Sequence, residues 1–236
     1  MTGPPGQRWF QLDFPYIETI LGDLTDPIGG WRALAAWEQL EAYSEAARYQ
    51  FSRRRKIFEE IEAELRAHPH DSDIEIARDH IRRHTQTFVD LHFYLDCFAM
   101  VETMMEVLVK VTGWSRCATA FAKWKPFLEN YAQARHHMQH IDERFPGGKH
   151  ARPQDMPGED STAIYVELLS AFPADRLTFG NDSWDVGPKS LELLDQAVAE
   201  FSQALAEDVR DFFVNERPYQ TQRGIYAVTP RPRPTS

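Results

Sequence analysis

The chain has 236 residues, of which 42% are hydrophobic and 26% are charged, and its formal net charge at pH 7 is −10. This composition is typical of a soluble globular protein that buries a sizeable core. The acidic balance argues against broad nucleic-acid binding, which is usually the property of basic domains, and we expect no DNA partner. No apolar run approaches the roughly 20 residues that a membrane helix needs, so we expect no membrane partner.

Two features favour a cytoplasmic location. Cys97 and Cys117 both lie in apolar surroundings, which is typical of buried free thiols in a reducing compartment. The N-terminal residues, MTGPPGQRWFQLDFPY, lack the apolar core of a signal peptide. We therefore expect a cytoplasmic protein without a disulfide framework.

The first part of the chain predicts an irregular segment followed by one long helix. Residues 1–30 contain several prolines and a Gly-Gly pair, which disfavour regular structure. Over residues 31–67, apolar side chains recur at spacings of three and four and predict a helix. The basic run at residues 53–56 is followed by glutamates and is interpreted as a solvated helix face rather than a phosphate site. Residues 68–73 are a predicted turn.

Two further main helices follow in the middle of the chain. The first is predicted over residues 74–111, with a strongly apolar second half that belongs in the core and Gly113 as its stop. A short helix is predicted over residues 115–121. The next main helix is predicted over residues 124–144, because Pro126 suits a first turn and a Pro-Gly-Gly sequence marks the end.

The last third of the chain carries the only strand signals. Residues 146–162 are rich in proline and glycine and predict a loop. Strand-like patterns occur over residues 163–169 and 176–186, and the Gly-Asn-Asp-Ser sequence within the second predicts a hairpin. A final helix is predicted over residues 191–214, and residues 217–236 are expected to form a disordered tail.

These elements predict an all-α, four-helix-bundle-like fold with a small β-hairpin between the third and fourth main helices. We expect one helical domain over residues 31–216, in which the long helices pack antiparallel. Helices of about 35 residues would be roughly 50 Å long, which is long for a bundle of this mass. They could therefore project beyond the bundle and form a homodimer.

The third main helix concentrates groups that can bind a metal, a phosphate or a proton. Within it, the run Arg135-His136-His137-Met138-Gln139-His140 resembles the Arg-x4-His signature of the HEPN superfamily (higher eukaryotes and prokaryotes nucleotide-binding). Proteins of that family are helical bundles that often dimerise, and many are metal-independent endoribonucleases of toxin or defence type. The resemblance implies RNA as substrate, with His140 as general acid or base, Arg135 stabilising charge on the scissile phosphate and His136 as an orienting group.

Two alternatives use the same helix differently. In the first, His80, His84, His136 and His140 form two i,i+4 pairs on adjacent helices and bind a metal, with Glu143 adding an oxygen ligand. In the second, the chain is a non-catalytic helical interaction module for a protein or nucleotide partner, and Arg135 pairs with an acid from another helix. No Gly-rich phosphate loop, nucleophile elbow or paired CxxC occurs, so no cofactor is expected. The sequence leaves an enzyme and a binding module as alternatives.

Overall fold

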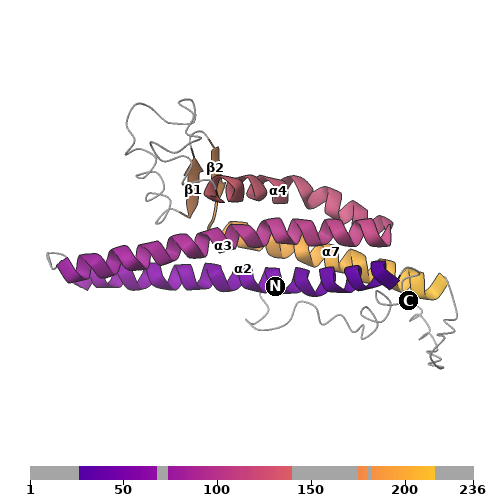
Figure 1. Ribbon diagram of the computed structural model, residues 1–236, viewed down its shortest axis with the longest axis horizontal. Helices are drawn as coiled ribbons and strands as arrows, with labels where there is room; N and C mark the ends of the chain where they lie inside the picture. Colours follow the sequence, from indigo (N-terminus) through magenta and orange to yellow (C-terminus); the bar gives the residue numbers. More distant parts are fainter. Residues whose placement is uncertain (1–26, 68–73, 140–174, 180–181, 216–236) are drawn as a thin grey trace, which may run out of the picture.

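The computed structural model describes residues 27–67, 74–139, 175–179 and 182–215. These residues form four helices that pack against one another and one two-stranded antiparallel hairpin, so the predicted all-α bundle with a small hairpin is confirmed (Figure 1). The elements are α2 (Pro27–Ala67), α3 (Ile74–Thr112), α4 (Ser115–Gln139), β1 (Arg176–Phe179), β2 (Asp182–Asp185) and α7 (Pro188–Asn215). None of the described helices is long and apolar enough to cross a membrane. The strand signal at residues 163–169 and the expected tail at residues 217–236 lie outside the described residues.

The helices α2 and α3 run antiparallel along most of their length. Two ion pairs set their register, since Arg53 contacts Asp90 at 3.0 Å and Glu64 contacts Arg83 at 2.8 Å. Helix α4 returns along α3, and α7 packs against α4, α2 and α3. Figure 1 shows that one end of the α2–α3 pair extends beyond the rest of the bundle, as the predicted helix lengths suggested.

The starts of three helices differ from the prediction, and α7 begins at Pro188, three residues earlier than expected. Helix α2 begins at Pro27, four residues earlier than expected, because proline loses no helical hydrogen bond in a first turn. Helix α4 is one continuous helix, so the separate short helix over residues 115–121 was wrong. Pro126 lies inside α4, where a proline leaves the carbonyl four residues earlier unpaired. Since Ala122 and Pro126 are both exposed, that carbonyl lies on the solvent side.

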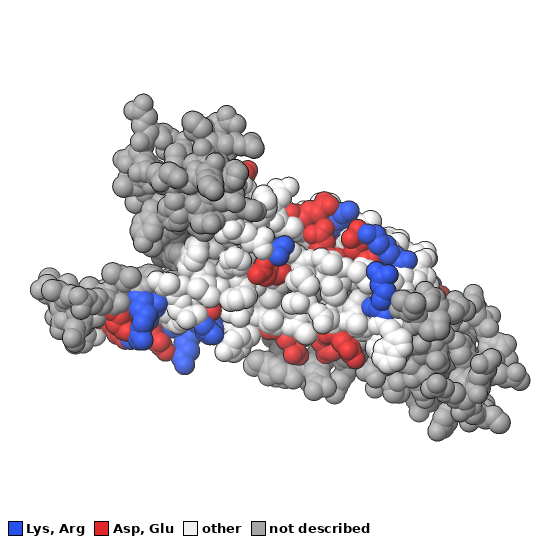
Figure 2. Space-filling model, in the orientation of Figure 1, with Lys and Arg blue, Asp and Glu red and all other residues white. Residues whose placement is uncertain are grey.

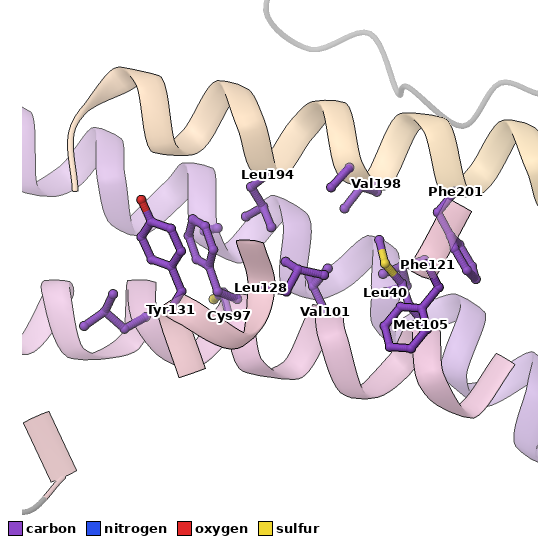
Figure 3. Packing of buried hydrophobic residues seen from close by; sticks show 14 of the residues in the cluster. Leu40, Cys97, Val101, Met105, Phe121, Leu128, Tyr131, Leu194, Val198 and Phe201 are labelled. Atoms are coloured by element: carbon purple, nitrogen blue, oxygen red, sulfur yellow. The ribbon is translucent and has the colours of Figure 1, made fainter. Parts of the chain in front are cut away.

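The core is built around aromatic rings of α3 and α4. The Phe98 ring stacks on Tyr131 with centroids 4.3 Å apart and meets the edge of Tyr94 at 5.0 Å. Figure 3 shows Leu194 and Val198 of α7 above this layer, which continues toward Phe201. These contacts confirm that the apolar stripes predicted for these helices face one another.

The hairpin is attached to the bundle by buried side chains on its inner face. Leu177 and Trp184 face each other across the two strands and are both buried. The Trp184 indole N–H donates to the Asn130 carbonyl at 2.8 Å, and the Tyr131 hydroxyl donates to the Asp185 carbonyl. Trp184 is therefore an anchor that holds the hairpin on α4.

Arg54 fixes the junction between the hairpin and α7. Its guanidinium donates to the Val186 carbonyl at 2.7 Å and to the Asp175 carboxylate at 3.3 Å, and the residue is only 2% exposed. Gly187 is required beside them, because a Cβ there would lie 2.5 Å from the Asp175 side chain. The prediction that residues 53–56 form a solvated face was wrong for Arg54. Burial was not foreseen because its partners are more than 120 positions away.

We predict that Arg54→Ala lowers the free energy of unfolding by about 3 kcal/mol, because a buried carbonyl and a partly buried carboxylate lose their donor. The matched control is Arg55→Ala, which removes a neighbouring arginine that is 42% exposed and contacts the same Asp175 at 3.3 Å. Its cost should be below about 1 kcal/mol, since exposed pairs contribute little. Urea unfolding followed by circular dichroism measures both, and equal small losses would contradict the assignment.

Candidate functional site

The last turns of α4 carry the residues that the sequence singled out. Tyr131, Ala134 and Met138 form the buried stripe of this helix. The helical repeat then places Arg135 at the edge of the α3–α4 contact and His136 on the exposed side. The residues therefore lie at the margin of the bundle rather than inside a cavity.

Arg135 forms an ion pair with Asp96 of α3. Its Nε donates directly to an Asp96 carboxylate oxygen, and both side chains are partly buried. His92, one turn before Asp96 on α3, lies 3.6 Å from the other carboxylate oxygen. The carboxylate compensates the charge of Arg135, which is the pairing that the module interpretation expected.

The histidines of α4 divide into one that faces the hairpin and one that faces solvent. The His137 ring lies 5.5 Å from the Trp184 ring, and its Nε2 lies 3.9 Å from an Asp182 carboxylate oxygen. His136 is exposed, with its ring 6.4 Å from that of His137. His137 thus contributes to attaching the hairpin, a role that spacing alone did not reveal.

Of the predicted Arg135/His140 pair, only Arg135 belongs to the described residues. Helix α4 is described as far as Gln139, so His140 and Glu143 lie outside the described residues. The distance between the two members of the pair, and the orienting role of His136, therefore stay predictions.

In the alternative metal site, His80 and His84 lie at a different height along the axis of the bundle from His136. His80 and His84 are in α3, but their side chains lie outside the described set. His84 precedes Asp96 by 12 positions, which is roughly 18 Å along a helix, and Asp96 marks the level of Arg135 and His136. Among the described residues, no group of three or more His, Cys, Asp or Glu side chains could hold a metal ion.

The two cysteines do not provide a nucleophile. Both are free and buried, as expected. Burial, reinforced by the nearby Asp96 carboxylate, raises the pKa of Cys97 to about 12. Burial likewise raises the pKa of Cys117, and Asp208 adds to the effect. Both thiols are therefore protonated at neutral pH, whereas thiol nucleophiles react as thiolates.

A groove between α4 and α7 was not predicted. It is an open surface groove of about 650 Å³ with small residues along it and charged residues at its edges. Arg116 contacts Asp211 at 2.6 Å and Asp208 at 3.0 Å, and Lys123 contacts Glu200 at 2.6 Å. Each of these cations already contacts a carboxylate of α7. The charge of Arg116 and Lys123 is therefore compensated, and these residues do not make the groove a site for an anion.

The outer face of α3 is a second feature that the sequence analysis missed. Six residues, which we call the α3 seam, succeed one another at alternating spacings of four and three: Val89, Phe93, Asp96, Met100, Thr103 and Val107. Phe93 is 52% exposed and Val89 is 39% exposed. In Figure 1, α3 passes in front of α7. In the same orientation, Figure 2 shows that the middle of this side of the molecule is mostly uncharged, with a few charged groups. The alternating spacing was present in the sequence, but which stripe of so apolar a helix faces outward depends on its neighbours.

Comparisons of the chain with protein families, with curated proteins and with solved structures found no match.

Proposed function

We propose that this chain is a non-catalytic helical interaction module and that the α3 seam is its docking surface. The observation that carries the proposal is the exposure of apolar side chains along α3. Helices α2, α4 and α7 all pack on this helix, yet Val89 and Phe93 remain in contact with solvent. An exposed apolar stripe on a helix that is otherwise covered by its own bundle is typical of a binding surface.

The energetics of the seam favour association. Full burial of a Phe or Val side chain contributes about 1.5–3 kcal/mol, and both Phe93 and Val89 have much of that burial still to gain. Asp96 is itself a seam residue, and its partners Arg135 and His92 lie beside the stripe. A polar group at the edge of an apolar patch adds orientation and partner choice more than affinity.

The charges at the described sites also fit a module better than an RNA-cutting enzyme. Arg135, Arg116 and Lys123 each contact a carboxylate. Binding an RNA phosphate would require those contacts to be exchanged, in a chain whose net charge is −10. Apolar contact needs no such exchange.

We predict that a photo-crosslinking amino acid at position 93 gives a discrete protein adduct when the full chain is irradiated in its own cells. The matched control carries the same group at Tyr49 of α2, which is 60% exposed and lies outside the seam. An adduct at position 93 and not at position 49 supports the seam as the docking surface. Adducts at neither position, or equally at both, would contradict it.

The ribonuclease hypothesis is the second candidate, and it is favoured by the position of Arg135 and His136 on the last described turn of a bundle helix. We expect purified protein to release no more fragments from a mixed RNA pool in EDTA than Arg135→Ala and His140→Ala do. Cleavage that persists in EDTA and is lost in both folded variants would instead establish an Arg/His ribonuclease and overturn the module.

A further inference from the structure

We infer that the occupant of the α3 seam is the α3 seam of a second copy of this chain, packed antiparallel across a two-fold axis. The inference rests on the proposed function, because it names the partner of the same surface. Three observations carry it: the heptad spacing of the seam, its self-complementarity and its size.

The seam has the spacing of a coiled-coil contact. Phe93, Met100 and Val107 occupy successive a positions of a heptad, and Val89, Asp96 and Thr103 occupy the d positions. The residues of the remaining positions already have partners within the chain. Those at b, c and f face the chain's own core, and they include Tyr94, Leu95, Phe98, Val101, Met105 and Leu108. Asp90, at an e position, contacts Arg53 of α2. The a and d positions form the most exposed edge of α3: Val89, Phe93 and Thr103 are exposed, and Met100 and Val107 are partly buried, with Val107 packed in part on the core. Their 3.5-residue repeat fits a partner that is itself a helix.

An antiparallel second copy places complementary side chains opposite one another. With the two-fold axis near residue 98, Val89 lies opposite Val107 and Phe93 lies opposite Thr103 of the second copy. The Thr103 hydroxyl donates to its own Ala99 carbonyl at 2.8 Å, so it can present its methyl group to the Phe93 ring without losing a hydrogen bond. The large Phe93 ring thus meets the smaller Thr103 side chain, and valine meets valine at both ends of the seam.

The opposite orientation is disfavoured by charge and shape. A parallel pair would place Asp96 against Asp96 and Phe93 against Phe93 of the second copy. In the antiparallel pair, Asp96 lies opposite Met100. Because Arg135 already contacts the Asp96 carboxylate, that carboxylate can enter the interface as half of an ion pair rather than as an isolated charge.

The area of the seam fits a reversible dimer. From Val89 to Val107 the seam spans 18 positions, or roughly 27 Å of helix. A contact one helix diameter wide, about 10–12 Å, would bury roughly 300 Å² on each copy, or about 600 Å² in total. That total is smaller than the roughly 1,200–2,000 Å² of stable interfaces, so we expect a weak, concentration-dependent equilibrium between monomer and dimer.

We predict that the purified full chain sediments as a mixture of 27.3 kDa monomer and its dimer, with the dimer fraction rising with concentration. Phe93→Glu should weaken the dimer at least ~100-fold, because each interface then holds two unpaired carboxylates. Val89→Asp, one turn away, should also weaken it. The matched control Tyr49→Glu changes an aromatic residue on α2 that is at least as exposed as Phe93, and it should leave the dimer unchanged. Circular dichroism checks that each variant is folded.

A monomer at every concentration up to about 100 µM, or a dimer that Phe93→Glu leaves intact, would overturn the inference. The outcome separates it from the proposed function. If the purified chain is monomeric while position 93 crosslinks to a different protein in cells, the second copy is excluded and the module stands. If neither association is found, both fail.

Discussion

The arrangement of the bundle depends on one buried cation. Arg54 of α2 reaches the Val186 carbonyl and the Asp175 carboxylate, and it holds the hairpin and the first turn of α7 at one point. Next to this contact, the Tyr94 hydroxyl of α3 and the Ser190 hydroxyl of α7 lie 2.9 Å apart, and Tyr131 of α4 binds the Asp185 carbonyl. All four helices therefore meet the hairpin junction through polar contacts. The direction in which α7 leaves this junction places its apolar stripe on the core.

That placement determines which side of α3 remains exposed. Helix α3 is apolar on most sides, as a helix in the centre of a bundle is expected to be. Helices α2, α4 and α7 all contact α3, and the seam residues Val89, Phe93 and Thr103 remain exposed. The Asp96–Arg135 pair lies along the same edge, so the arginine that the motif assigned to catalysis here neutralises a carboxylate beside an apolar surface. Arg135 therefore helps to shape a contact surface.

The helices could be predicted from the sequence because local signals determine them. Periodicity gave α3 and α7 to within a few residues, and Gly113, which adopts a φ of 66°, ends α3 as predicted. The contacts of the site could not be predicted in the same way. Arg135 meets Asp96 from a separation of 39 positions, and Arg54 meets its partners from more than 120. The Arg/His spacing was also a weak guide to function, because looser matches occur at residues 78–84 and 144–150 of the same chain.

The most direct test is a distance between identical spin labels in the assembled protein. The native cysteines are buried and protonated, so a single Glu106→Cys or Lys110→Cys, at positions outside the seam with exposed side chains, can be labelled selectively. An antiparallel α3 pair centred near residue 98 predicts a label separation of about 26 Å at position 106 and about 37 Å at position 110. Equal short distances at both positions would indicate a parallel pair, and the absence of any pair distance would indicate a monomer. Either of those results would contradict the account.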